Sequence, residues 1–359
     1  MPDAHDRRRA ALRAALAAEG IEAALVTRLV NVRYLTGFTG SNGALLIAAD
    51  TTVLTTDGRY TTQSAQQAPD VERLITAAVT TDLVRRACAG GAGRIGFEAH
   101  DVTVEAHGRL VAAAEGAELT PLGCAVEKLR AVKDEDEIDL IRAACRAADD
   151  AFAELVGTRL EGRTEKAIRD DLESRMRVHG ADAPSFETIV ASGPNSAIPH
   201  HRPTDRVVHR GDFVKLDFGA LVAGYHSDMT RTVVVGPPAD WQRDLHALVS
   251  AAQQAGIDAL RAGAVSAAVD KVARDVIDDA GHGEEYTHSL GHGVGLEIHE
   301  APSLRADGPD TLADLMPVTV EPGIYLPDRG GVRIEDLLVV RPAGPEALTT
   351  AAKDLLVVQ

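Results

Sequence analysis

Two aspartates interrupt a stretch of sequence that otherwise reads as two paired strands. Residues 213–235 are FVKLDFGALVAGYHSDMTRTVVV, with Asp217 in the first apolar arm and Asp228 in the second. With a two-residue loop at Val222 and Ala223, counting outward sets the two aspartates opposite each other on one face. Two carboxylates on a half-buried face repel each other, and a divalent cation removes that penalty. The hairpin therefore predicts a metal site, against the alternative of two solvated aspartates near a turn.

Three further segments offer side chains of matching chemistry. His292 lies among glycines in LGHGVG, and these small neighbours leave the imidazole accessible. Glu321 ends a strand-like stretch directly before Pro-Gly. Glu335 lies in VRIED, where the alternation of a strand over 334–340 places it on one face with Arg333. Taken alone, each has an ordinary structural explanation, since Glu335 could be an edge-strand acid and most histidines are surface or packing residues.

Together these segments hold four carboxylates and one imidazole, a hard ligand set suited to Mn²⁺, Co²⁺, Fe²⁺ or Zn²⁺. Two ions about 3.5–4 Å apart can hold a shared hydroxide for attack on a carbonyl or phosphoryl group. The residues by themselves leave peptidase, phosphatase and deacylase activities open.

The five segments LDFG, SDMTRT, GHGVGLEIHE, EPGIY and VRIED occur in the order of the metal-site segments of the pita-bread metallopeptidases, which they resemble. That family includes methionine aminopeptidase, aminopeptidase P, prolidase and creatinase, and the resemblance covers about residues 125–340. It implies two divalent ions, with Mn²⁺ as the first choice and Co²⁺, Fe²⁺ or Zn²⁺ as alternatives. The implied ligands are Asp217, Asp228, His292, Glu321 and Glu335.

The same resemblance implies roles for residues around these ligands. His200 and His299 would contact the scissile carbonyl and the charge that develops on it, and one such donor is typically worth about 3–4 kcal/mol. Arg333 would keep the carboxylates charged and oriented, and Glu321 would also carry the proton of the nucleophile to the leaving nitrogen. Further expected neighbours of the site are His201, Tyr225, Arg231 and His288.

The elements that must position these residues fall into two predicted domains, 1–125 and 126–359. The first alternates a helix at 7–19 with short strands at 22–27, 44–49, 52–55 and 94–97, which predicts an α/β domain. Its glycines at 37, 40 and 43 lack the spacing of a dinucleotide-binding loop. The segments NVRYLTGFTGSNG and DGRY resemble the N-terminal domain of the aminopeptidase P and prolidase branch.

The second predicted domain begins with helices and continues with strands. Asp134 and Glu137 have the spacing of a capping box before a long helix, and a second helix follows Thr164 and stops near Gly180. Strands follow from residue 185, with further helices near 240–262 and 266–280. The predicted fold class is thus α+β, a creatinase-like N-terminal α/β domain followed by a pita-bread catalytic domain.

Composition excludes several classes of partner. The 359 residues carry a net charge of −17 and only 3% aromatic residues, which argues against nucleic-acid or anionic-membrane binding. No apolar run approaches the ~20 residues of a membrane span, and the N-terminus lacks a secretory signal pattern. Cys88, Cys124 and Cys145 are widely spaced and form neither a disulfide frame nor a zinc knuckle, so a cytoplasmic protein with reduced thiols is expected.

The expected activity is hydrolysis of an Xaa-Pro bond at the N-terminus of a peptide, with aminopeptidase P as the first choice and prolidase as the alternative. A prolidase must recognise the free carboxylate of a C-terminal proline, and Arg202, Arg206 and Arg329 are candidates for that contact. A metal-free creatinase-like hydrolase or a non-catalytic interaction module would be expected to lack ligands, whereas all five occur here. The resemblance also implies a homodimer.

Overall fold

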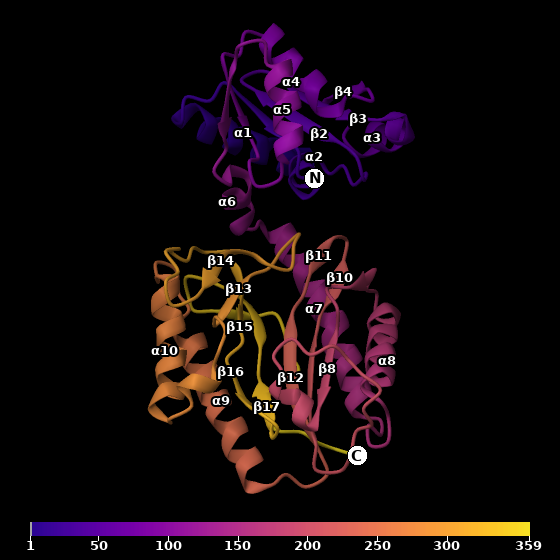
Figure 1. Cartoon of the computed structure of the whole chain (residues 1–359), viewed down its shortest axis with the longest axis vertical. Helices are drawn as coiled ribbons and strands as arrows, with labels where there is room; N and C mark the ends of the chain where they lie inside the picture. The colour runs from indigo at the N-terminus through magenta and orange to yellow at the C-terminus, as the bar shows by residue number, and fades with distance from the viewer. Residues whose placement is uncertain (1) are drawn as a thin grey trace. The chain divides into compact units, whose positions relative to one another are not determined.

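The computed structural model describes residues 2–359, with side chains from residue 4 onward. The chain forms two compact units, Met1–Arg130 and Ala131–Gln359 (Figure 1). Helices and mixed sheets occur in both units, and the predicted α+β class is confirmed. Among the described residues, no helix is both long and apolar enough to cross a bilayer.

The N-terminal unit is built on a six-stranded mixed sheet with the order β4-β3-β2-β1-β5-β6. Buried side chains of α4 and α5 pack in one cluster with those of β1 and β2, such as Leu83 and Leu110 with Leu25 and Leu46. Each such burial stabilises the fold by about 1.5–3 kcal/mol. The strands are β1 (Ala23–Val26), β2 (Ala44–Ala48), β3 (Thr52–Thr56), β4 (Glu72–Ile75), β5 (Arg94–Phe97) and β6 (Glu118–Pro121). The helices are α1 (Pro2–Ala18), α2 (Leu29–Thr36), α3 (Thr61–Gln67), α4 (Val79–Ala89), α5 (Val104–Ala113) and α6 (Ala125–Ala131).

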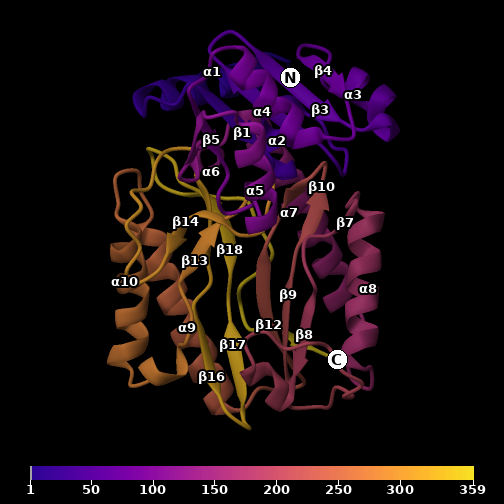
Figure 2. The same cartoon turned by 45° about the horizontal axis from the view of Figure 1, so that its top comes forward.

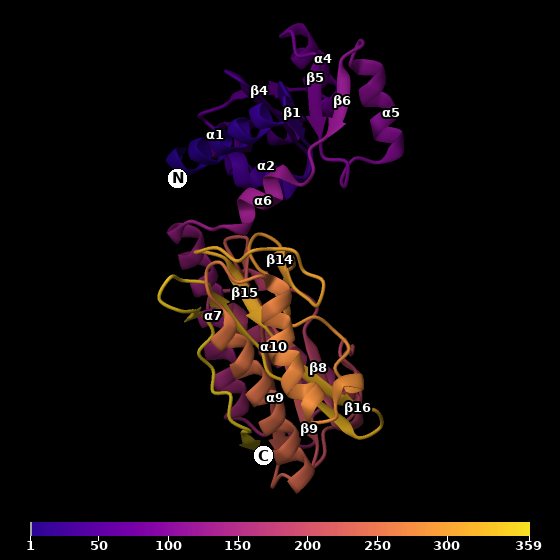
Figure 3. The same cartoon turned by 90° about the vertical axis from the view of Figure 1, so that its left-hand side faces the viewer.

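The C-terminal unit has one pair of helices on each side of its strands (Figure 1). The helices are α7 (Glu135–Val156), α8 (Glu165–Val178), α9 (Asp240–Ala259) and α10 (Ser266–Asp279). The predicted capping box is present, since Asp134 and Glu137 exchange backbone-to-side-chain hydrogen bonds at the start of α7. The Thr164 side chain caps α8, as expected. Figure 3 shows α9 and α10 running side by side.

Two larger sheets meet inside this unit, with the orders β20-β12-β9-β8 and β14-β13-β15-β18-β19, together with a β16–β17 hairpin (Figure 2). Phe152 of α7 stacks on Phe218 of β9, whereas Val249 of α9 packs with Ile324 of β16 and Val332 of β17. The strands are β7 (Ala183–Pro184), β8 (Ile189–Ser192), β9 (Phe213–Phe218), β10 (Ala220–Val222), β11 (Tyr225–His226), β12 (Met229–Val235), β13 (Gly291–Gly293), β14 (Glu300–Leu304), β15 (Pro317–Val320), β16 (Gly323–Leu326), β17 (Gly330–Arg333), β18 (Asp336–Val339), β19 (Glu346–Ala347) and β20 (Val357–Val358).

The hairpin that carries the two aspartates differs in register from the prediction. Its turn lies one residue later, at Ala223 and Gly224, which adopt φ values of 47° and 81°. Positive φ at both central residues is the requirement of a type I′ turn, whose twist matches that of the strands. Asp217 therefore pairs with Thr230 rather than with Asp228. The partner changes by two residues, which preserves the alternation, so both carboxylates still belong to one face.

The predicted strand over 334–340 is interrupted at its start. Arg333 ends β17, and β18 begins only after Glu335, because the chain leaves one partner strand and joins another. Opposite the break lies Pro322, which has no N–H to continue a ladder. Its carbonyl accepts a hydrogen bond from Ile334 N at 3.4 Å.

Candidate metal centre

Two of the expected ligands come from the β9–β12 pair. Asp217 is the penultimate residue of β9, and Asp228 directly precedes β12. Their neighbours in both strands are buried, so the carboxylates enter the interior and are themselves only 7% and 5% exposed. Such burial of two acids is unfavourable without a compensating charge.

The two glutamates come from the point where two ladders meet. Glu321 follows β15 and Glu335 precedes β18, and the pairing of Val320 with Asp336 brings them to the same level of the sheet. Glu335 N donates to Thr230 O at 3.1 Å, which ties this segment to β12. The four carboxylates thus converge from two separate sheets.

His292 approaches these carboxylates from β13. Its Nε2 lies 3.5 Å from Asp228 Oδ2 and 3.4 Å from Glu321 Oε1. Its Nδ1 is 3.0 Å from the carbonyl of Gly293, so Nδ1 carries the proton and the lone pair of Nε2 faces the acids. The neighbouring glycines allow this approach, because a Cβ at Gly291 would overlap Thr319 O.

The electrostatics of the cluster favour protonated carboxylates in the absence of a cation. Burial raises the pKa of Asp228 and of Glu335 well above the usual value, and neighbouring carboxylates raise it further. Burial also raises the pKa of Glu321 to about 7. Burial lowers the pKa of His292, which keeps the imidazole neutral.

These features fit a divalent cation. Donor atoms of Asp228, His292 and Glu335 all lie within 4.8 Å of one another. Thr230 donates to Glu335 Oε2 at 2.6 Å, whereas Glu335 Oε1 is buried without a hydrogen-bond partner among the described residues. An unpartnered carboxylate oxygen beside an imidazole lone pair is stabilised by a metal ion, which accepts both as ligands.

Arg333 lies behind the carboxylates and organises them. Its Nη2 is hydrogen-bonded to Asp217, its Nε donates to Thr230 Oγ1 at 3.1 Å, and its Nη1 donates to Tyr325 Oη at 2.7 Å. Tyr325 Oη in turn is 2.8 Å from His288 Nε2. The guanidinium therefore orients an expected ligand directly, and the chain of hydrogen bonds fixes its plane.

A cavity of about 600 Å³ opens onto the carboxylates. His200 and His299, the two expected substrate contacts, both line it. The rings of His292 and His299 pack edge to face with centroids 4.4 Å apart. Burial lowers the pKa of His299, so its imidazole is neutral at neutral pH. A neutral imidazole facing the cavity can donate one N–H to a substrate oxygen.

The four further expected neighbours, Arg231, His201, Tyr225 and His288, have different partners. Arg231 donates to the carbonyl of Glu335 and pairs with Asp336. The His201 imidazole lines the cavity and is 2.8 Å from Glu165, which anchors its loop, whereas Tyr225 Oη donates to Glu137 of α7 at 2.8 Å. His288 lines the cavity, and burial lowers its pKa to about 3.

Lys215 is a residue of this site that the sequence pattern did not indicate. It is fully buried in β9, and its Nζ donates to the carbonyls of Ser196, Ile198 and Pro199 at 3.1, 2.7 and 3.3 Å. These carbonyls belong to the loop that ends in His200. The only sequence signal for this role is a lysine at a strand position where apolar residues dominate.

Among the three candidate arginines, Arg202 lines the cavity. Its side chain is 83% exposed and lies 3.3 Å from Glu187, so its guanidinium is free to move towards a substrate. Arg206 is paired instead with Asp212 at 2.6 Å, and Arg329 lies over the ring of Trp241.

Two family models match the sequence. The model described as metallopeptidase family M24 matches residues 139–342, and the Creatinase/Prolidase N-terminal domain matches residues 8–132.

Known proteins resemble the chain in sequence and in structure. The Xaa-Pro dipeptidase of Pyrococcus furiosus is 42% identical over 231 residues, which are 64% of this chain and 66% of that protein. The solved structure of an Xaa-Pro dipeptidase from Bacillus anthracis is 38% identical and superposes with a TM-score of 0.95 over 99% of this chain and 100% of that one. The structure of an X-Pro aminopeptidase from Thermotoga maritima is 37% identical, with a TM-score of 0.90 over 98% and 99%.

Proposed function

The chain belongs to metallopeptidase family M24, and we propose that within this family it is an Xaa-Pro dipeptidase. The observation that supports this choice is the similarity to the P. furiosus and B. anthracis proteins, both named Xaa-Pro dipeptidases. Aminopeptidase P, the first choice from the sequence, is less well supported, although the T. maritima protein carries an aminopeptidase name. The substrate would be a dipeptide with a C-terminal proline.

The proposed cofactor is a pair of divalent ions, with Mn²⁺ as the first choice, held by Asp217, Asp228, His292, Glu321 and Glu335. Such ions polarise a carbonyl and lower the pKa of a bound water molecule. The buried, unpartnered Oε1 of Glu335 supports this ligand set.

The remaining steps fall to side chains of the cavity. His299 and His200 would donate hydrogen bonds to the carbonyl oxygen of the first substrate residue as negative charge develops there. The proline nitrogen must receive a proton in order to leave as a neutral amine. Glu321, an expected metal ligand that also lines the cavity, is our candidate to accept a proton from the nucleophile and pass it to that nitrogen.

The Arg202 guanidinium is our candidate for binding the proline carboxylate, because it lies at the exposed edge of the cavity. A carboxylate–guanidinium pair would favour a dipeptide over a longer peptide, whose proline carboxyl group is an amide. Replacing Arg202 with alanine should therefore raise KM for the dipeptide and leave KM for a tripeptide nearly unchanged.

The test compares a matched Xaa-Pro dipeptide and Xaa-Pro-Yaa tripeptide with Mn²⁺-loaded protein. Release of the first residue from the dipeptide, with poor cleavage of the tripeptide, is the expected result. Preferential cleavage of the tripeptide would refute the dipeptidase and favour aminopeptidase P. If the metal-loaded protein cleaves neither peptide, the Xaa-Pro assignment is wrong. Glu321→Gln with metal retained is the control and should lower kcat by orders of magnitude.

A further inference from the structure

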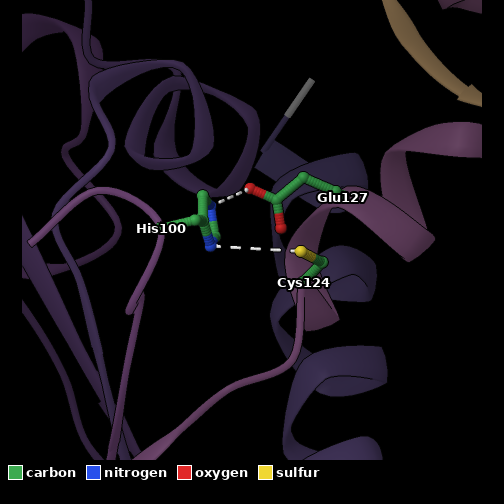
Figure 4. Close-up of side chains that lie close together, drawn as sticks. All are labelled: His100, Cys124 and Glu127. Atoms are coloured by element: carbon green, nitrogen blue, oxygen red, sulfur yellow. Dashed lines mark hydrogen bonds and ion pairs between the residues drawn. The ribbon is translucent and has the colours of Figure 1, made fainter.

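A second group of metal-ligating side chains lies in the N-terminal unit. His100 follows β5, Cys124 directly precedes α6, and Glu127 is in the first turn of α6. One donor atom from each lies within 4.8 Å of the others, and Figure 4 shows the three side chains facing a common space. We refer to these three residues as the N-terminal cluster.

Hydrogen bonds around Glu127 engage one of its two carboxylate oxygens. Oε1 accepts from Asn31 Nδ2 at 2.7 Å and from His100 Nε2 at 2.9 Å, and Arg28 Nη1 lies 3.5 Å from it. Oε2 is buried and has no hydrogen-bond partner among the described residues. Burial raises the pKa of Glu127, but the hydrogen bonds from Asn31 and His100 lower it below its usual value overall, so the group is a carboxylate.

The same contacts define the tautomer of His100. A carboxylate only accepts hydrogen bonds, so the proton of a neutral His100 is on Nε2. The lone pair of Nδ1 therefore faces Cys124 Sγ, 4.0 Å away (Figure 4). This tautomer leaves the Nδ1 lone pair available to bind a metal ion.

Nitrogen, sulfur and oxygen donors at this spacing suit zinc. With Zn–S near 2.3 Å and Zn–N near 2.0–2.1 Å, two ligands of one tetrahedral ion lie roughly 3.5–4 Å apart. His100 and Cys124 are exposed, so an ion can enter from solvent and a water molecule can fill the fourth position. The unpartnered Oε2 supplies the third protein ligand.

We propose that His100 Nδ1, Cys124 Sγ and a carboxylate oxygen of Glu127 bind one Zn²⁺ ion, at a site separate from the candidate metal centre. Binding releases the thiol proton to solvent and leaves the thiolate as the ligand. The ion would connect the loop after β5 to the start of α6, two segments that follow the neighbouring parallel strands β5 and β6.

The test uses Co²⁺ as a spectroscopic substitute for zinc in the full-length protein, reduced with a phosphine rather than a thiol. Thiolate ligation of Co²⁺ gives an intense near-ultraviolet charge-transfer band, which carboxylate and imidazole ligation do not give. Because the expected ligands of the candidate metal centre include no cysteine, the band reports only on a thiolate site. With the two ions of the candidate metal centre already bound, we expect one further equivalent of Co²⁺ to produce the band and one further equivalent of Zn²⁺ to abolish it.

Variants identify the ligands. The matched control is Cys88→Ser, in which the band should persist. In the wild type the Cys88 thiol donates to Ala114 O at 3.1 Å and takes no part in the proposed site. The band should disappear in Cys124→Ser, and His100→Ala and Glu127→Gln should each weaken Co²⁺ binding about 10–100-fold. Absence of the band in the wild type, or its survival in Cys124→Ser, would overturn the proposal.

A lone reactive thiol is the competing explanation. If Cys124→Ser abolishes the band while His100→Ala and Glu127→Gln bind Co²⁺ as tightly as the wild type, the three-ligand site is refuted. A second measurement avoids substitutions altogether. With the candidate metal centre already filled, one further equivalent of Zn²⁺ should protect Cys124 of the wild type from alkylation, as mapped by mass spectrometry, and an unchanged alkylation rate would also refute the site.

Discussion

Removal of metal should make the stability of the protein fall as pH rises. In the metal-free protein, burial raises the pKa of Glu321 from 4.5 to about 7 and that of Asp228 and Glu335 well above usual values. Between pH 4.5 and 7 the folded state therefore binds more protons than the unfolded state. Protonation of these carboxyl groups stabilises the folded state. This stabilisation is complete below the pKa that the groups have in the unfolded state, and it is lost as pH rises through their pKa in the folded state.

The pKa shift of Glu321 alone gives the size of this loss of unfolding free energy. A rise in its pKa from 4.5 to about 7 on folding corresponds to about 3 kcal/mol of unfolding free energy, which is lost above pH 7. For a domain of this size, that equals a fall of about 6–12 °C in Tm. Asp228 and Glu335 shift in the same direction and add to this loss.

The assay records Tm by calorimetry at pH 5, 6, 7 and 8 for chelator-treated and Mn²⁺-loaded protein. Bound metal requires deprotonated ligands, so the loaded protein should not show this loss, and the gap between the two Tm values should widen with pH. Glu335→Gln should reduce the widening because it removes one titrating group. Asp244→Asn, at an exposed position of α9, is the matched control and should leave the widening unchanged. A gap that stays constant or narrows from pH 5 to 8 would refute the reasoning.

Three substitutions test other parts of the site. Arg333→Lys keeps the positive charge but loses the planar fork that binds Asp217, so activity or metal affinity should fall about 10–100-fold in kinetic and metal-content measurements. His299→Ala should lower kcat about 100–1000-fold at unchanged metal content, and a parallel loss of metal would contradict its assignment as a substrate contact. Lys215→Met leaves three carbonyls without their donor, so chemical denaturation should show a loss of about 1–3 kcal/mol. It should also lower kcat by loosening the loop of His200, and an unchanged kcat would limit Lys215 to a structural role.

Much of the C-terminal unit could be predicted because its signals are local. The Asp134–Glu137 capping box and the Thr164 cap involve residues three positions apart, and both are present at the predicted helix starts. Alternation also placed Asp217 and Asp228 correctly on one face, because an error of two residues in a strand leaves the face unchanged.

The features that escaped prediction depend on partners distant in sequence or on backbone conformation. The alternation pattern does not reveal that Ala223 adopts positive φ, so the turn was placed one residue too early. The break at Ile334 and Glu335 is opposite Pro322, which lies between β15 and β16. Cys124 has no nearby cysteine in the sequence, and its proximity to His100 arises only when the ends of β5 and β6 are neighbours in the sheet.

The paired positions of Glu321 and Glu335 determine which changes in chain length the protein can accommodate. Both glutamates are attached to one β16–β17 hairpin, whose strands pair from Gly323–Arg333 to Leu326–Gly330. Residues added at the tip of this hairpin lie beyond the last pair and leave the spacing at its base intact. A single residue inserted between Val320 and Gly323 would instead displace one glutamate relative to the other. Natural length variation in such chains should therefore concentrate at the tip of the hairpin and be absent from its base.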